Sequence, residues 1–412
     1  MPRRRMVKGL AVGGFAAALG PPMSSSVARA ATASSPVDAL TRAGAGGGPY
    51  PASDPTNAGG WTLDPVFSDE FTGRALDAAK WYDHITYWEG RAPSYFDPAN
   101  VGLDRGRAVI PFRNLNKVAN PSFEDGVASW EVSAGGVEIV YEGTVAPMTA
   151  RLAAGAWARQ TVTGLHPHTT YRLSAYGKIP AGAEGVVRVS GYDGDSAQDL
   201  SLTSASFAPA GLTFVTGRDA MSATVTLLNP GASGSIDVTM VAVIDARDDA
   251  PLGSFFSTGA IQSRTMAHYG YYEVRAKVAD SSSTSSFWFQ GSESEIDVIE
   301  AIGNSTLDPG YGSMMPMNLH YFPGGWANDQ AFPMQYDTGV RLADGFHVFG
   351  LDWQPESIRF YFDGTLVRTQ DNLYWHEPEY LFLDSEAFLW FGFPPPGTLP
   401  SEYQIDYVRA WK

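Results

Sequence analysis

Three carboxylic acids lie close together in the stretch SESEIDVIEAIG, residues 292–303. Glu295, Asp297 and Glu300 are separated only by isoleucine and valine, a pattern that predicts a β-strand with one apolar face. Strict alternation places Glu295 and Asp297 on one face of this strand and Glu300 on the other. A β-bulge that absorbs one extra residue would return Glu300 to the side of the other two acids. We therefore expect a bulged strand that carries a row of three carboxyl groups.

Such a row is suited to the hydrolysis of a glycosidic bond. The retaining route uses two carboxyl groups about 5–5.5 Å apart, one as the nucleophile and one as the proton donor. A third carboxyl between them can hydrogen-bond the nucleophile and, by repulsion, keep the donor protonated near neutral pH. The alternative is a half-exposed strand whose acids only face water. Trp288, in the preceding run SFWFQ at 286–290, favours the first interpretation, because a pyranose packs its C–H face on an aromatic ring.

The run EIDVIE at 295–300 is similar to the catalytic signature of glycoside hydrolase family 16 in its bulged form. The resemblance implies that Glu295 is the nucleophile, Asp297 the assisting acid and Glu300 the acid/base. The run FSDEFTGRALDAAKW at 67–81 resembles the opening of the same family, with Trp81 buried. The family resemblance implies no required cofactor; a structural calcium ion is possible, but the sequence does not locate its ligands.

Composition indicates a β-rich globular protein with many turns, since the 412 residues include 44 glycines and 28 prolines and are 44% apolar. There are no cysteines, so disulfides and thiolate chemistry are excluded. The formal net charge of −16 argues against a nucleic-acid partner.

The N-terminal 30 residues predict an export signal. Arg3, Arg4, Arg5 and Lys8 precede a short apolar run, and Ala28-Arg29-Ala30 is typical of a cleavage site. The basic cluster resembles the twin-arginine pattern, so we expect a secreted, extracellular protein without a membrane span. Residues 31–60 are rich in Ala, Ser, Gly and Pro and predict a flexible linker.

The stretch YWEGRAPSYFDPANVGLDRGRAVI at 87–110 resembles a segment of family 16 enzymes that cut red-algal galactans, agarases above all. Trp88 and Arg91 are long side chains in a Gly/Pro-rich loop, which suits substrate binding. Ordinary anchoring of the loop is the alternative.

Residues 114–247 interrupt the family pattern. Short alternating strands with Gly, Pro and Asn between them predict a separate β-sandwich. It resembles carbohydrate-binding modules with a galactose-binding-like jelly-roll fold, although a purely structural domain is also possible. The family pattern resumes at residue 248, so we expect a catalytic domain made of residues 61–113 and 248–412 with the sandwich inserted in it.

Further alternating runs follow the acids, at 317–322, 346–353, 357–369, 379–393 and 403–411, with an Asp363-Gly364 hairpin signal. These runs specify an all-β fold, a jelly-roll sandwich of the concanavalin A-like type. Asn318 and His320 share one face of their strand, which by resemblance contacts sugar, although His320 suits a core position equally well. Trp326 in PGGWAND predicts a sugar platform, and Glu386 matches a substrate contact of agarase-like relatives, unless it is a plain edge-strand acid.

We therefore predict a secreted, monomeric, retaining endo-β-galactanase whose partner is an algal galactan, agarose above others. The alternatives are a porphyranase or carrageenase, which would need basic contacts for sulfate, and a laminarinase acting on β-1,3-glucan. An alternative of another class is a glycan-binding protein without turnover.

Overall fold

The computed structural model describes residues 49–305 and 307–412. The predicted export signal and the first part of the predicted linker lie outside the described residues. Within the described ranges, no helix has the length and apolarity needed to cross a membrane.

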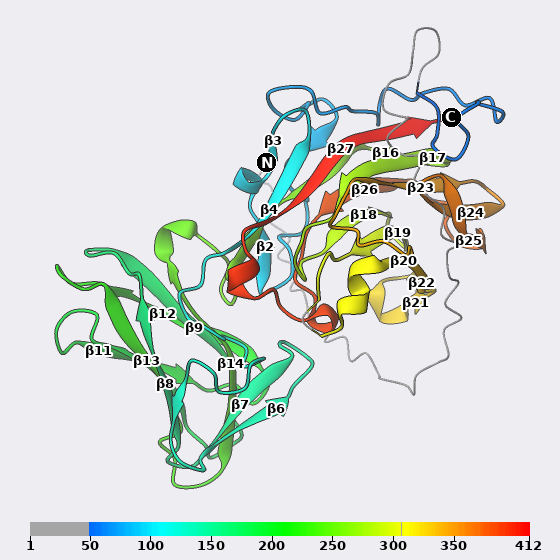
Figure 1. The fold of residues 1–412 in the computed structure, drawn as a ribbon. Coiled ribbons are helices and arrows are strands. Elements are labelled where there is room, and N and C mark those ends of the chain that lie inside the picture. The colour runs from blue at the N-terminus through cyan, green and yellow to red at the C-terminus, as the bar shows by residue number, and fades with distance from the viewer. Residues whose placement is uncertain (1–48, 306) are drawn as a thin grey trace, which may run out of the picture.

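The described chain is built from β-strands joined by turns and short 3-10 helices, and the predicted all-β class is confirmed (Figure 1). An eight-stranded sheet carries the acidic signature. Its order is β1-β16-β26-β18-β19-β20-β21, with β22 also paired to β20. The strands are β1 (Trp81–Tyr82), β16 (Ala260–Ala267), β26 (Glu379–Asp384), β18 (Ser285–Gln290), β19 (Ser294–Ala301), β20 (Met314–Tyr321), β21 (Gln330–Ala331) and β22 (Met334–Asp337).

A nine-stranded sheet in the order β2-β15-β4-β27-β17-β23-β24-β25, with β3 paired to β4, belongs to the same part of the molecule. Its strands are β2 (Ser94–Phe96), β15 (Phe256–Thr258), β4 (Ala108–Asn114), β27 (Ser401–Trp411), β17 (Gly270–Lys277), β23 (His347–Trp353), β24 (Ser357–Phe362), β25 (Thr365–Asp371) and β3 (Gly102–Leu103). β24 and β25 form the predicted hairpin, in which Asp363 and Gly364 have φ values of 46° and 77°.

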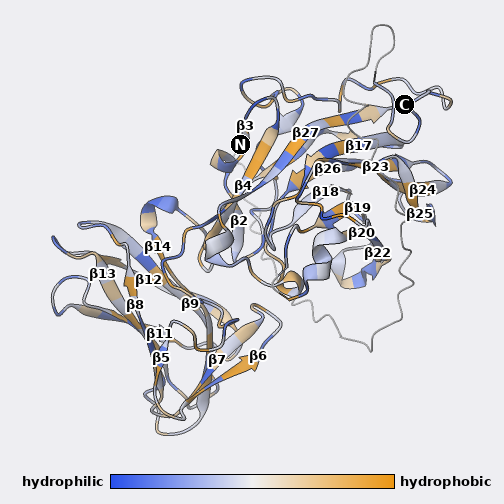
Figure 2. Ribbon diagram, viewed as in Figure 1, coloured by the Kyte–Doolittle hydropathy of each residue, from blue (hydrophilic) through white to orange (hydrophobic). Residues whose placement is uncertain are grey.

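The two large sheets share one apolar core, to which Ile296 and Phe289 contribute from the first sheet and Val274 and Phe349 from the second. Apolar segments along the strands supply this core (Figure 2). Burying such side chains contributes about 1.5–3 kcal/mol each. Trp81 is buried as predicted, and Trp353, Trp375 and Trp411 are buried as well.

Residues 131–245 form two five-stranded sheets that lie to one side of the large sheets (Figure 1). One sheet has the order β11-β10-β13-β8-β5 and the other β12-β9-β14-β7-β6, and a core of their own fills the space between them. The strands are β5 (Glu131–Val132), β6 (Val137–Tyr141), β7 (Met148–Ala153), β8 (Trp157–Thr163), β9 (Thr170–Lys178), β10 (Gly185–Ser190), β11 (Ala197–Leu202), β12 (Ala208–Val215), β13 (Ser222–Leu228) and β14 (Ser235–Asp245). That this region is an inserted carbohydrate-binding module stays a prediction.

A smaller apolar cluster joins the two parts. Tyr176 of β9 and Met240 of β14 lie in it together with Phe112, Phe256 and Phe393 from the large-sheet part. Because the contact is buried and apolar, the sheet β12-β9-β14-β7-β6 is packed against β4, β15 and the segment that holds Phe393.

The structure differs from the sequence expectation in two places. Residues 49–60 of the predicted flexible linker lie in turns, where Ala52 N donates to Glu273 Oε2 at 2.9 Å and Pro49 O accepts from Trp411 Nε1 at 2.8 Å. The predicted strand at 379–393 ends at Asp384, and a 3-10 helix, η6 (Leu389–Phe391), follows. The remaining 3-10 helices are η2 (Pro98–Asn100), η3 (Ala246–Asp248), η4 (Pro309–Ser313), η5 (Trp326–Asn328) and η7 (Pro396–Thr398).

Candidate active site

The predicted β-bulge is present in β19. Along the partner strand β18, Ser286 faces Glu300 and Trp288 faces Asp297, and the pairing slips by one residue between them. Val298 is the extra residue, and it is fully buried in the core, as are its apolar neighbours. Glu295, Asp297 and Glu300 therefore all point to the other face of the sheet, away from that core.

Strand pairing sets the acids in rows across the sheet, and we call the surface formed by these rows the acidic face. Its three rows are His320–Glu295–Gln290–Tyr380, Asn318–Asp297–Trp288–Phe382 and Glu300–Ser286–Asp384. The acids thus lie on adjacent strands near one another, with Glu295 and Glu300 half-buried and open to an approaching ligand.

Glu295 is held from two sides. Its Oε2 accepts a hydrogen bond from Gln290 Nε2 at 2.6 Å, and Gln290 Oε1 in turn accepts from the Tyr87 hydroxyl at 2.5 Å. Beneath the strand, Trp375 Nε1 donates to the backbone carbonyls of Glu295 and His320, at 3.1 and 3.0 Å. The Gln290 amide favours the ionised form of Glu295, since a donated hydrogen bond stabilises a carboxylate.

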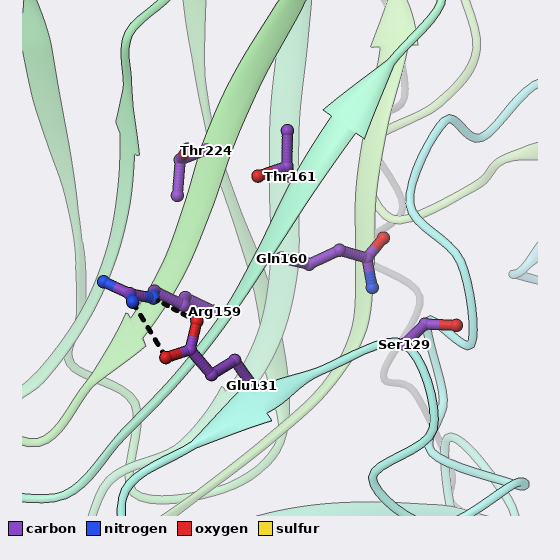
Figure 3. A pocket seen from close by; sticks show the side chains of 6 residues that line it. All are labelled: Ser129, Glu131, Arg159, Gln160, Thr161 and Thr224. Atoms are coloured by element: carbon purple, nitrogen blue, oxygen red, sulfur yellow. Dashed lines mark hydrogen bonds and ion pairs between the residues drawn. The ribbon is translucent and has the colours of Figure 1, made fainter.

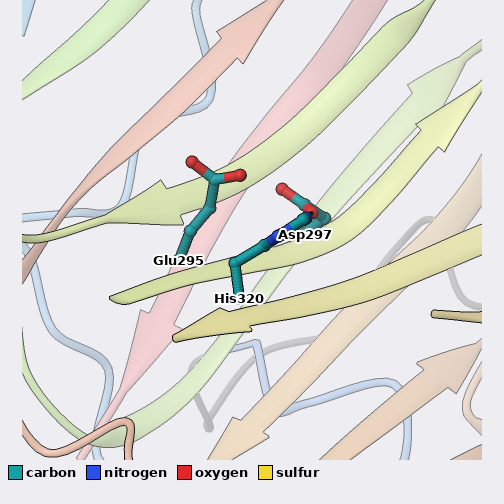
Figure 4. A group of neighbouring side chains, drawn as sticks. All are labelled: Glu295, Asp297 and His320. Carbon is teal, nitrogen blue, oxygen red and sulfur yellow. Dashed lines mark ion pairs between the residues drawn. The ribbon is translucent and has the colours of Figure 1, made fainter. Parts of the chain in front are cut away.

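Asp297 lies beside an imidazole (Figure 4). His320 Nε2 is 3.5 Å from Asp297 Oδ2 and 2.7 Å from Asn318 Nδ2, while its Nδ1 is 3.0 Å from both oxygens of Asp329. If Nδ1 carries the proton toward Asp329, Nε2 is free to accept from the Asn318 amide. This chain of contacts fixes His320 on the acidic face, so of its two expected positions the one beside the acids is observed.

Glu295, Asp297 and His320 also form a group whose ligand atoms lie within 4.8 Å of one another. Two carboxylates and an imidazole nitrogen are a poor match to calcium, which prefers six to eight oxygen ligands. We assign these residues to the acid cluster rather than to a metal site, and the location of a calcium ion is not predicted by them.

The charges of the acidic face shift the pKa of each carboxyl upward. Burial, followed by repulsion from the neighbouring acids, raises the pKa of Glu295 and of Asp297 well above its usual range. Burial, with an added effect from Asp384, raises the pKa of Glu300 to about 7 against the lowering effect of Arg91. The surroundings therefore favour protonated carboxyls in this cluster, and Glu300 titrates near pH 7.

Arg91 supplies positive charge to this acidic surface. Its guanidinium lies 4.8 Å from the ring centre of Phe388, 5.9 Å from that of Trp88 and 6.0 Å from that of Trp390. Arg91 lowers the pKa of Glu295, Glu300 and Glu386, although burial nevertheless raises the pKa of Glu386 to about 8. Trp88 and Arg91 of the predicted binding loop thus lie together, with the aromatic rings holding the cation in place, and their contact with substrate stays a prediction.

Glu386 is buried and follows β26, so the alternative of an edge-strand acid does not hold. Its Oε1 accepts no hydrogen bond from any residue that the structure describes. This buried oxygen is close enough to Arg91 and Glu300 to interact with their charges, so Glu386 belongs to the electrostatic surroundings of the acids.

The aromatic candidates differ in exposure. Trp288 is only 8% exposed, because it stacks on Phe382 with 4.3 Å between ring centres and donates from Nε1 to Asp384 Oδ2 at 2.9 Å. Trp326 is 41% exposed and stacks on Phe322 at 4.1 Å. Trp326 therefore offers more ring surface to a sugar than Trp288 does.

Sequence reasoning missed Gln290, Asp329 and Asp384. Gln290 could have been found, since it alternates with Trp288 along the same strand. Asp384 lies far from the signature in sequence, and only the pairing of β26 with β18 brings it opposite Ser286.

Comparison with known proteins identifies a family model and several relatives that this chain resembles. Residues 234–412 match the family model described as the GH16 domain of beta-porphyranases A–D. A kappa-carrageenase of Pseudoalteromonas carrageenovora is 26% identical over 192 residues, which cover 38% of this chain and 47% of that protein. Beta-porphyranase D of Zobellia galactanivorans is 44% identical over 57 residues, 14% of this chain and 13% of that protein. The chain thus spans less than half the length of these two relatives.

Among solved structures, porphyranase B from Zobellia galactanivorans aligns with a TM-score of 0.48 at 17% identity, covering 85% of this chain and 92% of that chain. The structure described above is an all-β protein with a cluster of carboxylic acids on one sheet face. Residues 234–412 of this chain are thus similar to the catalytic domain of glycoside hydrolase family 16.

Proposed function

We propose that this protein is a retaining endo-hydrolase that cleaves β-linkages in a red-algal galactan. The observation that carries the proposal is the bulge at Val298, which places Glu295, Asp297 and Glu300 on one face of the sheet. The family model over residues 234–412 supports the same chemistry.

In the first step, the protonated carboxyl of Glu300 donates its proton to the glycosidic oxygen while the Glu295 carboxylate attacks the anomeric carbon. The glycosidic C–O bond breaks, the leaving chain departs with the proton, and a covalent glycosyl-enzyme forms. In the second step, the Glu300 carboxylate takes a proton from water, which attacks the same carbon and releases Glu295. Asp297, whose pKa is raised by burial and by its neighbours, carries a proton that it can donate to the Glu295 carboxylate.

For the substrate, we favour porphyran over the agarose that sequence reasoning placed first. The matching family model and one relative, beta-porphyranase D, are both named as beta-porphyranases. Another relative is named as a kappa-carrageenase, and no agarase is among these three matches. Arg91 would supply the basic contact to sulfate that this substrate needs, since a guanidinium can pair with an oxyanion through two parallel hydrogen bonds.

We also keep three proposals that rest on the sequence alone. The first 30 residues direct export by the twin-arginine route, the protein acts as a monomer, and residues 114–247 form a glycan-binding module inserted in the catalytic domain. Size-exclusion chromatography of the secreted protein tests the monomer, and N-terminal sequencing tests cleavage after Ala30.

Reducing-sugar release from porphyran, agarose, kappa-carrageenan and laminarin tests the proposed function. We expect the fastest release from porphyran, and Glu295→Gln should lower turnover by several orders of magnitude while the protein folds normally, since the nucleophile is removed. Binding of these polysaccharides without release from any of them would identify a glycan-binding protein instead. Near-normal activity of Glu295→Gln would refute the assigned nucleophile.

A further inference from the structure

A hollow of about 310 Å³ opens on the sheet β11-β10-β13-β8-β5, far along the chain from the acid signature (Figure 3). This volume is at the lower end of the roughly 300–1,000 Å³ typical of small-ligand sites. Its lining is almost entirely hydrogen-bonding: Ser129, Glu131, Arg159, Gln160, Thr161 and Thr224.

The hollow lies at one end of a polar row that crosses the sheet. Strand pairing sets Glu131, Arg159, Thr226, Arg188 and Asp199 side by side on five neighbouring strands. Because neighbouring strands are about 4.8 Å apart, this row extends over roughly 19 Å. We call it the polar row.

Each end of the polar row is a bidentate ion pair. Arg159 Nε and Nη2 donate to Glu131 at 2.8 Å each, and Arg188 Nε and Nη2 donate to Asp199 at 2.7 and 2.8 Å. All four charged side chains are exposed. Within the described residues, the Nη1 of neither arginine has a hydrogen-bond partner, so each guanidinium keeps donors for a ligand.

An apolar row runs beside the polar row, one step along the same sheet face. It consists of Trp157, Leu228 and Val186, which are paired with one another and half-buried. The Arg159 guanidinium stacks over the Trp157 ring at 4.9 Å, which joins the two rows at the edge near the hollow.

We propose that this surface, the hollow with its polar and apolar rows, binds a second segment of the galactan chain, away from the acidic face. A sugar chain presents C–H faces and hydroxyl edges together, which match an apolar row beside a row of donors and acceptors. The two ion pairs neutralise themselves, so the surface suits the hydroxyl groups of the galactan chain rather than its sulfate groups.

The position of this surface fits such a role. The other five-stranded sheet makes the contact with the large-sheet part, through Tyr176 and Met240. The proposed surface belongs to the outer sheet and faces away from that contact, so a chain held there does not block the acidic face. The inference rests on the proposed function for its choice of galactan as the ligand.

The test uses the full chain with Glu295→Gln, which prevents hydrolysis during the measurement. Arg159→Ala and Trp157→Ala are added singly, and affinity is measured by retardation in porphyran-containing and agarose native gels. Arg151→Ala is the matched control, because Arg151 makes the same kind of bidentate pair, with Asp237 at 2.8 and 3.0 Å, on the other sheet. We expect both test variants to weaken retardation about tenfold or more in at least one gel, and Arg151→Ala to leave it unchanged.

Two further measurements keep the proposal refutable. Thermal unfolding identifies any test variant that fails to fold. In that case Thr224→Lys replaces it in the binding measurement, because a lysine at this half-buried position fills the hollow. In the active protein, Arg159→Ala should leave kcat/KM on short soluble oligosaccharides within about twofold of the parent. Folded test variants that bind both gels like the Arg151→Ala control would overturn the proposal. If the parent protein, without any substitution, hydrolyses none of the polysaccharides, the proposed function is refuted instead.

Discussion

Deletion of Val298 is predicted to leave the protein active. Val298 is the extra residue of the bulge, so its removal turns the signature into Glu-Ile-Asp-Ile-Glu, in which plain alternation keeps all three acids on one face. Glu300 would still face Ser286, because one residue then lies between Asp297 and Glu300, just as one residue lies between Trp288 and Ser286.

The cost should appear in stability instead. Val298 is fully buried, and a buried valine contributes about 1.5–3 kcal/mol to folding. We therefore expect the free energy of unfolding, measured with urea, to fall by about that amount. Reducing-sugar release from porphyran at a temperature where the variant is folded should stay within about tenfold of the parent, a change of about 1.4 kcal/mol in the barrier.

The matched control is deletion of Ile296, which is also fully buried. This deletion removes the spacer between Glu295 and Asp297, so the two acids can no longer share a face. We expect its activity to fall to the level of Glu295→Gln. A folded Val298 deletion with no more activity than Glu300→Gln would refute the argument that the bulge serves only to align the acids.

The remaining predictions concern pH and the support of the site. Activity should fall as pH rises through about 7, because Glu300 must be protonated to act as the acid and its pKa is about 7. Arg91→Ala should move this alkaline limb of kcat/KM to higher pH, because Arg91 lowers the pKa of Glu300. Asp384→Asn should move the limb to lower pH, because Asp384 raises that pKa. Shifts of both variants in the same direction would contradict the assignment. Trp375→Phe should lower the free energy of unfolding by at least about 1–3 kcal/mol, because two buried carbonyls, including that of Glu295, lose their donor; an unchanged urea midpoint would count against this support.

The sequence was informative where the deciding contacts are local. Three acids with apolar spacers implied a bulge, since no other local geometry places all of them on one face while the spacers enter the core. The Asp363-Gly364 turn was equally predictable, because its two positive φ values suit these residues.

Features that depend on distant pairing were less predictable. Asp384 acts on Glu300 only because β26 lies beside β18, a register that no local pattern encodes. The apolar run after Asp384 was interpreted as strand, but the chain instead turns into a 3-10 helix so that Phe388 and Phe391 pack with Ile302. Tertiary burial thus outweighed the local preference for an extended chain.

Proton NMR of the first products from porphyran tests the central claim most directly. If Glu295 and Glu300 act as nucleophile and acid/base on one bond, the newly formed reducing end appears first in the β-configuration of the cleaved linkage. The account predicts this β-anomer at early times, followed by slow mutarotation. First appearance of the α-anomer would contradict a covalent intermediate on Glu295, and with it the roles given to the three acids of the bulged strand.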